Sequence, residues 1–258
     1  MNLSLTLLKT YAENSPPLQE AAIFSHFGPD HLFWLAGLSA ASFITAFLHG
    51  KASDKGRKRI RKCLGLFCFF LHLFTQGRTL VPGRYGLYDL PLHLCALTVY
   101  LILLHVLAEK APPVSAALGE ILFFPCLPGL ISALVFPGWN EHPAFSFYSC
   151  SSFISHGAMA LYIVLCLKDG SIRPSIKRCW IPVIFLAVYA GLVLPFDLAM
   201  GPNFGFLKEP VPGTPLQLIS DLYGGGAGYR AGFALLVLFL EFVCYLICEL
   251  LKRQNKGF

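Results

Sequence analysis

The segment DLPLHLC, residues 89–95, places an aspartate, a histidine and a cysteine at the start of a long apolar run. A thiolate is a strong nucleophile, and an imidazole is the usual base that takes the thiol proton. Residues four apart share a face of a helix, whereas residues two apart do not. The spacing therefore predicts that His93 faces Asp89 and that Cys95 is turned away from both. We interpret Asp89 and His93 as supporting or substrate-binding residues, with a helix-capping role for Asp89 as the alternative.

The base for Cys95 must then come from another segment, and His156 is the best candidate in the arrangement that the rest of the chain predicts. A cysteine with a histidine beside it has the general plan of covalent acyl transfer. The first turn of a helix, where Cys95 is expected, also favours a thiolate through the helix dipole. Ser152 stays open as a rival nucleophile because it lies four residues before His156, and Cys150 is a weaker rival.

The composition points to a protein whose surroundings are lipid. Of the 258 residues, 55% are hydrophobic and 13% are charged, whereas soluble domains carry about 25% charged residues. A spanning helix needs about 20 apolar residues, and helices are the plausible spanning structure for such segments. The sequence predicts an all-α polytopic membrane protein, a single domain over residues 1–258 with seven transmembrane helices, at roughly 31–49, 62–81, 90–108, 114–136, 147–168, 179–200 and 230–251.

The basic residues predict the orientation of these helices. Most lysines and arginines fall in the first connection (50–62), the third, the fifth and the C-terminal tail. Because cytoplasmic loops carry the excess of Lys and Arg, the N-terminus is expected outside and the C-terminus in the cytoplasm. Residues 1–30 then form an outside tail and 201–229 a long outside loop. This distribution accounts for the net charge of +6 without a nucleic-acid partner.

With this orientation, polar side chains from several helices converge in the outer half of the bundle. Such side chains are costly in a membrane and mark function by default; hydrogen bonds between helices are the alternative explanation. The chain has nine cysteines but no CxxC, CxxH or HExxH spacing, so no metal site or cofactor is predicted. Besides Cys95 and His156, the expected site includes as supporting or substrate-binding residues Asp89, His93, His72, Gln76, Arg78, Ser152, Asp197 and Asn203.

Three short motifs carry a family resemblance: LPLHLC at 90–95, SHG at 155–157 and PNFGFL at 202–207. They resemble the YwaF-type bacterial integral membrane proteins, which are related to the animal transmembrane protein 164 group. The animal proteins are described as cysteine-dependent acyltransferases of ether lysophospholipids. A more remote similarity is to the androgen-induced membrane hydrolases of fatty-acid esters. The resemblance implies Cys95 as the nucleophile and His156 as the base.

The chain departs from the family pattern at two places. Phe204 stands where the family has a tyrosine, and GGGAGY precedes the last helix where the family has tryptophans. The resemblance to the bacterial family implies a location in the bacterial cytoplasmic membrane. It does not carry the ether-lipid preference of the animal proteins over to this chain.

Together these features predict an acyltransferase or acyl hydrolase whose partner is a membrane phospholipid or lysophospholipid. Cys95 would attack the ester carbonyl while His156 takes the thiol proton and then protonates the leaving oxygen. Gln76 or Arg78 would hold the phosphate or polarise the carbonyl. The alternative is a transporter or channel with a polar outer vestibule, which Pro125 and Pro128 in the fourth helix favour. The sequence does not predict an oligomeric state.

Overall fold

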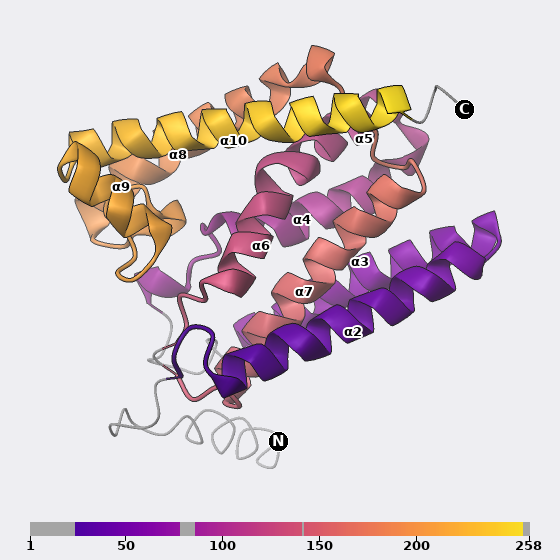
Figure 1. The fold of residues 1–258 in the computed structure, drawn as a ribbon, viewed down its shortest axis with the longest axis horizontal. Helices are drawn as coiled ribbons and strands as arrows, with labels where there is room; N and C mark the ends of the chain where they lie inside the picture. The colour runs from indigo at the N-terminus through magenta and orange to yellow at the C-terminus, as the bar shows by residue number, and fades with distance from the viewer. Residues whose placement is uncertain (1–23, 78–85, 141, 255–258) are drawn as a thin grey trace. The chain divides into compact units, whose positions relative to one another are not determined.

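The computed structural model describes residues 24–77, 86–140 and 142–254, and within these ranges the regular structure is helical, without strands. The chain divides into two compact units, which are described separately. Unit 1 comprises Met1–Pro91 and Leu130–Leu165, and unit 2 comprises Leu92–Gly129 and Cys166–Phe258. The α-helices (Figure 1) are α2 Pro29–Lys51, α3 Asp54–Gly77, α4 Leu94–Leu107, α5 Pro112–Ile121, α6 Leu127–Val135, α7 Phe147–Lys168, α8 Trp180–Met200, α9 Pro215–Tyr223 and α10 Ala227–Gln254.

All seven segments that the sequence predicts as spans contain helix, and the all-helical class is confirmed. Five stretches in the described ranges are long and apolar enough to cross a membrane. The helices of the other two predicted spans are not among these five. The helix α4 is short, with 14 residues, and α3 carries the basic run. Seven spans and their orientation stay predictions. The five stretches are Pro29–Lys51, Pro112–Val135, Phe147–Lys168, Ile176–Met200 and Ala227–Lys252.

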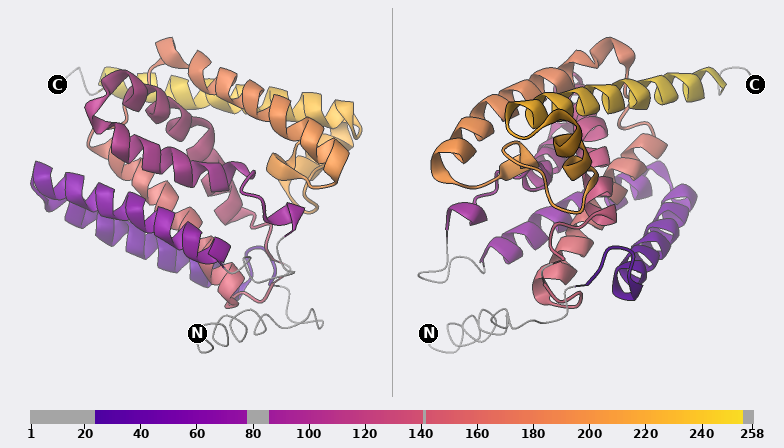
Figure 2. Two further views of the ribbon diagram at one scale, coloured as in Figure 1. Left: turned by 180° about the vertical axis from the view of Figure 1, so that it is seen from behind. Right: turned by 60° about the vertical axis from the view of Figure 1, so that its left-hand side comes forward.

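The prediction that residues 50–62 form a connection is wrong, because α3 begins at Asp54 and takes up most of the basic run. The Ser53 hydroxyl accepts the Gly56 amide at 3.3 Å, which caps the start of α3. Arg57 donates to two carbonyls at the end of α2, at 3.1 and 3.3 Å. Lysine and arginine are good helix formers, so the run extends the helix while its charges stay at that end. The two helices lie side by side (Figure 2).

The core of unit 1 is aromatic. The Trp34 indole stacks on Phe153 of α7 with ring centroids 5.0 Å apart, and Trp139 meets the same ring edge-on at 5.2 Å. Trp34 donates from Nε1 to the Ala144 carbonyl at 2.9 Å. The buried His31 donates from Nε2 to a carbonyl of α6 at 2.8 Å. These contacts fix α2 against the first turns of α7, where Ser152 and His156 lie.

Within unit 2, the predicted fourth span is interrupted. A π-helical turn, Leu122–Cys126, joins α5 to α6, and Phe124 within it has extended backbone angles (φ −143°, ψ 128°). The residue before a proline is pushed out of the helical region, and Pro125 follows Phe124. Phe124, Pro125 and Cys126 are buried. Irregular backbone at membrane depth is tolerated where protein covers it.

The predicted outside loop 201–229 is not wholly irregular, because it contains α9, and α10 starts at Ala227 rather than 230. Gly224 and Gly226 have φ of 72° and 64°, which lets the chain reverse between the two helices. The pair packs closely: a Cβ on Gly232 of α10 would lie 2.7 Å from the Tyr223 ring of α9. Figure 2 shows α9 against the beginning of α10.

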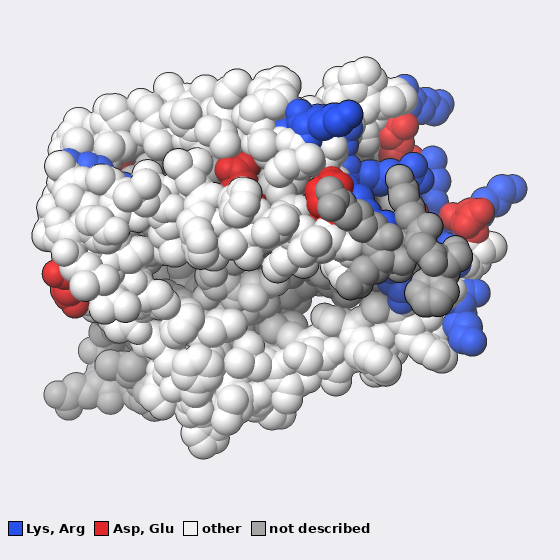
Figure 3. Space-filling view, turned by 45° about the horizontal axis from the view of Figure 1, so that its top comes forward, with Lys and Arg blue, Asp and Glu red and all other residues white. Residues whose placement is uncertain are grey.

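Large apolar side chains are exposed on the long helices, as a lipid-facing surface requires. Phe43 of α2 is 74% exposed, Leu192 of α8 70% and Phe239 of α10 62%. Figure 3 shows broad areas of one face without charged side chains. The chain is therefore an integral membrane protein by the composition and the exposed surface of its helices.

Candidate functional site

Cys95 is the second residue of α4 and is half-buried. The helix starts later than predicted, at Leu94, with His93 as its N-cap residue in an extended conformation (φ −62°, ψ 142°). Leu90 is extended as well (φ −60°, ψ 136°), because it precedes Pro91. The predicted helix from residue 90 is therefore wrong at its start, and the thiol of Cys95 lies in the first turn, beside amides that no helical carbonyl bonds.

Asp89 and His93 consequently do not share a helical face. Asp89 belongs to a 3₁₀ turn, Leu87–Asp89, where its Oδ2 accepts the Gly86 amide at 2.8 Å. Asp89 therefore caps this short turn, whereas the alternative prediction had placed it as the cap of the helix that follows. The pairing of Asp89 with His93 by i, i+4 spacing is wrong, and their contribution to catalysis stays untested.

His93 instead meets the loop that contains the motif PNFGFL. Its Nδ1 accepts the Gly205 amide at 3.4 Å, so the proton of a neutral ring is on Nε2. Its ring lies edge-on to Phe204, with centroids 5.0 Å apart, and 5.6 Å from Phe206. His93 of the first motif and the loop of the motif 202–207 are thus in contact within unit 2.

Tyr189 of α8 is a residue that the sequence reasoning missed, and it lies against Cys95. It is 7% exposed, and its hydroxyl donates to the Leu92 carbonyl at 2.8 Å. Cys95 and Asp197 lie near its phenol. A tyrosine in the middle of an apolar helix needs a partner for its hydroxyl, and this is the signal that could have identified it. Tyr189 therefore holds the start of α4 in place.

Position 205 requires a glycine because Tyr189 lies too close for a side chain there. Its φ is +64°, and a Cβ there would lie 2.6 Å from the Tyr189 hydroxyl oxygen. Asn203, predicted as a substrate-binding or supporting residue, organises the same loop: its Oδ1 accepts the Lys208 amide at 3.1 Å, and its Nδ2 donates to the Glu209 carbonyl at 2.8 Å. The loop and Tyr189 together fix the backbone that leads into Cys95.

Asp197, another predicted site residue, is fully buried near the C-terminal end of α8. Among the described residues neither of its carboxylate oxygens has a hydrogen-bond partner. Tyr189, Lys208 and the backbone of Phe204 are its electrostatic neighbours. It therefore lies in the same neighbourhood as Tyr189 and the loop.

A second thiol lies near Cys95. Cys126 follows the interruption at Phe124, interacts electrostatically with Cys95 and hydrogen-bonds the Thr98 side chain. Thr98 in turn donates to the Leu94 carbonyl at 2.8 Å. Neither the Cys126 thiol nor the Tyr189 phenol is a base at neutral pH, so neither of these two groups supplies the base that a cysteine nucleophile needs.

His156, the predicted base, lies on α7 in unit 1 and is 8% exposed. Its Nδ1 is 2.8 Å from the Ser152 carbonyl. A carbonyl only accepts hydrogen bonds, so Nδ1 carries the proton and Nε2 of the neutral ring is the basic nitrogen. The Trp139 indole covers the ring, with centroids 4.9 Å apart. Ser152 therefore orients His156 through its backbone. The Cys95–His156 pair joins residues of different units and stays a prediction.

Two of the remaining predicted residues, His72 and Gln76, belong to α3. His72 is 9% exposed, and its carbonyl accepts the Thr75 hydroxyl at 2.8 Å. Gln76 is half-buried and shares the face of His72 by its i, i+4 spacing. Arg78 lies outside the described residues. Within the described ranges, no group of three or more His, Cys, Asp or Glu residues is placed to hold a metal ion.

Residues 26–251 match the model of the TMEM164 family. Because the match covers most of the chain, the chain belongs to this family. None of the curated proteins and none of the solved structures matches it.

Proposed function

We propose that this member of the TMEM164 family transfers or hydrolyses acyl chains of a membrane phospholipid or lysophospholipid, with Cys95 as the nucleophile and His156 as the base. The observation that carries the proposal is the state of His156, whose Nδ1–H is bound to the Ser152 carbonyl at 2.8 Å. The basic Nε2 is thereby left to accept a proton. The motifs of the family resemblance support the same two residues.

In this mechanism Nε2 of His156 takes the proton of the Cys95 thiol as its sulfur attacks the ester carbonyl. The tetrahedral intermediate collapses to a thioester, and the imidazolium protonates the departing lysophospholipid oxygen. An acceptor hydroxyl, or water, then attacks the thioester while His156 again removes the proton. Tyr189 would not react; it holds the Leu92 carbonyl and so positions the turn from which the thiol projects.

Substitution of the two residues tests the mechanism. In the purified chain reconstituted with a phospholipid labelled in its acyl chain, Cys95→Ala and His156→Ala should each reduce transfer by about a thousandfold or more. The double variant should be hardly worse, because residues that act as a unit are not additive. Cys63→Ala is the matched control, since Cys63 is exposed on α3 and should leave transfer unchanged. Full activity of Cys95→Ala together with loss in Ser152→Ala would move the nucleophile to α7.

We also propose the topology of seven spans with an outside N-terminus and a cytoplasmic C-terminus. The five long apolar stretches support part of it, and the basic residues at the start of α3 and in the connection before α8 support the orientation. In this topology Cys95 and the loop of Asn203 and Gly205 belong to the outer half. The substrate would then enter from the outer leaflet.

One observation favours the transporter alternative. The extended backbone at Phe124 makes α5–α6 a discontinuous helix, and transporters build their substrate sites at such interruptions. Flux of a labelled lipid or solute into proteoliposomes, undiminished in Cys95→Ala, would favour transport over acyl transfer.

A further inference from the structure

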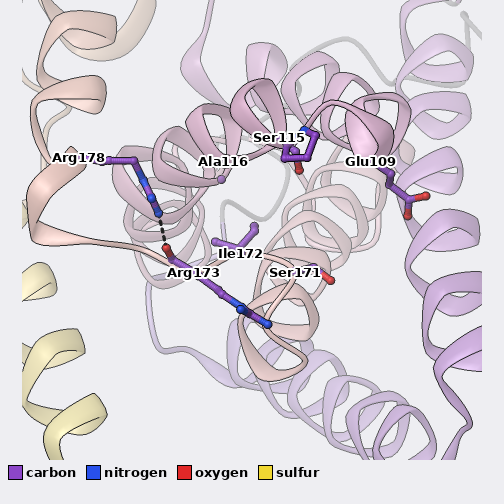
Figure 4. A pocket seen from close by; sticks show the side chains of 9 residues that line it. Glu109, Ser115, Ala116, Ser171, Ile172, Arg173 and Arg178 are labelled. Carbon is purple, nitrogen blue, oxygen red and sulfur yellow. Dashed lines mark hydrogen bonds between the residues drawn. The ribbon is translucent and has the colours of Figure 1, made fainter.

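Unit 2 contains a pocket of about 350 Å³ that neither Cys95 nor His156 lines. It lies between the start of α5 and the connection that leads from α7 into α8 (Figure 4). Its size is at the lower end of the range for small-ligand sites. The lining residues are Glu109, Pro112, Ser115, Ala116, Gly119, Ser171, Ile172, Arg173 and Arg178.

The pocket contains a guanidinium that a buried carboxylate and a backbone carbonyl hold in place. Arg178 donates from Nε to Oε1 of Glu120 at 2.7 Å and from Nη2 to the Arg173 carbonyl at 2.7 Å. Glu120 is 1% exposed and also accepts the Ser175 amide at 3.1 Å and the Tyr245 hydroxyl at 2.6 Å. Arg178 is therefore ordered before any ligand arrives, which reduces the entropy cost of binding.

The second guanidinium, that of Arg173, is oriented only at its inner nitrogen. Its Nε donates to the Gly170 carbonyl at 2.8 Å. The terminal nitrogens of Arg173 and Nη1 of Arg178 make no hydrogen bond to an acceptor among the described residues. Arginine forks match the oxygens of a phosphate in a bidentate fashion. These unused donors therefore suit a phosphate or phosphate ester.

The other lining groups fit the same ligand. The Ser115 hydroxyl is a further donor from the opposite wall, while Ile172 forms an apolar floor that is 2% exposed. Pro112 and Pro113 begin α5 and have no N–H, so the arginines rather than helix amides would bind the anion. The single lining carboxylate, Glu109, is drawn at the opposite end of the pocket from Arg178 (Figure 4).

The position of the pocket along the helices supports a lipid as the source of the phosphate. Two membrane-length stretches start beside it, at Pro112 and Ile176. A third stretch ends there, since Lys252 at the end of Ala227–Lys252 donates to the Pro174 carbonyl. The ends of spanning helices lie at the level of the lipid headgroups.

We propose that this pocket binds a phosphate ester through Arg173 and Arg178, as the headgroup of a phospholipid or as a soluble phosphate ester. The site is separate from the proposed acyl-transfer site and does not depend on it. It would hold an anionic lipid at one end of unit 2, or sense a phosphorylated metabolite there.

Thermal unfolding of the purified full chain in phospholipid-free detergent tests the site. The probes are sodium phosphate, glycerol 3-phosphate and a short-chain phosphatidylglycerol, with sodium chloride at matched ionic strength and a short-chain diacylglycerol as blanks. We expect phosphatidylglycerol to raise the unfolding temperature and the diacylglycerol to leave it unchanged. An equal effect of glycerol 3-phosphate or inorganic phosphate would identify a soluble ligand instead, and stabilisation by none of the three would overturn the proposal.

Single substitutions test whether the pocket itself binds the phosphate, rather than positive charge on the surface in general. Arg173→Gln should weaken binding by about tenfold or more, since it removes a charge-assisted contact, and Ser115→Ala should weaken it less. Lys177→Gln is the matched control, because Lys177 is exposed and four residues from Arg173 but does not line the pocket. Equal losses in Arg173→Gln and Lys177→Gln would overturn the proposal. Arg178→Gln is less informative, because it would leave the buried Glu120 without its cation.

Discussion

Replacement of Gly205 by alanine tests whether the loop and Tyr189 support the turn before Cys95. Alanine at a φ of +64° costs about 1 kcal/mol in backbone strain. The new Cβ would lie 2.6 Å from the Tyr189 hydroxyl oxygen and 3.0 Å from its nearest ring carbon. Tyr189 must therefore move and lose its bond to the Leu92 carbonyl, which is worth about 1 kcal/mol. We expect a total loss of about 2 kcal/mol in the free energy of unfolding.

Gly213→Ala is the matched control for this change. Gly213 has a similar φ of +72°, but no heavy atom lies within 4 Å of the position of its Cβ. It should therefore cost only the backbone strain, about 1 kcal/mol. In a Tyr189→Phe background, Gly205→Ala should cost less than in the wild type, because the closest atom is gone and the bond to Leu92 is already absent.

Two measurements are needed, because stability alone does not report on the site. Denaturant unfolding in detergent gives the free energies, and the rate at which a lipid-like electrophile alkylates Cys95, in a chain without the other cysteines, reports on the position of the thiol. We expect Gly205→Ala and Tyr189→Phe to change this rate, and Gly213→Ala to leave it unchanged. Equal costs of the two alanine variants, with an unchanged rate of alkylation in all three, would refute the role of Tyr189.

Two further predictions concern the carboxylates and the topology. Glu120→Gln should destabilise the chain by about 3 kcal/mol, because it leaves Arg178 facing a neutral amide in a buried network. Glu249→Gln should cost less than about 1 kcal/mol, since its partner Lys252 is partly exposed; comparable losses in denaturant unfolding would contradict the importance of burial. Single cysteines at the exposed positions Lys55 and Lys177 should be shielded from an impermeant thiol reagent in intact cells, and one at Pro212 should react. Reaction at Lys177 but not at Pro212 would reverse the predicted orientation.

The helical class and the membrane character were predictable because they depend on composition and on local patterns. Apolar runs of about 20 residues specify helices wherever they occur, since lipid offers no partner for an unpaired backbone group. The ends of the helices were less predictable. The basic run at 50–62 was interpreted as a connection from its charge, although its residues favour helix. The helix α4 starts at Leu94 rather than at residue 90, because His93 is still extended and serves as its N-cap.

The candidate site, too, was predictable in some features and not in others. Sequence motifs predicted Cys95 and His156 as the reacting pair, which stays a prediction, and the structure specified which nitrogen of His156 is basic, through the carbonyl four residues before it. Such a contact within one helix turn is local and was within reach of the spacing argument. The sequence offered Asp89 as a cap of the helix that follows, but its partner is the Gly86 amide of a preceding turn.

Only the tertiary structure revealed the groups that surround Cys95 and the second pocket. The partners of Tyr189, Gly205 and Glu120 are 97, 112 and 125 residues away in the chain. A sequence shows that a buried tyrosine hydroxyl or carboxylate must have partners, because an unpaired polar group is costly in an apolar surrounding. Which partner it meets depends on how the helices pack, and that is decided by contacts between residues with no regular spacing along the chain.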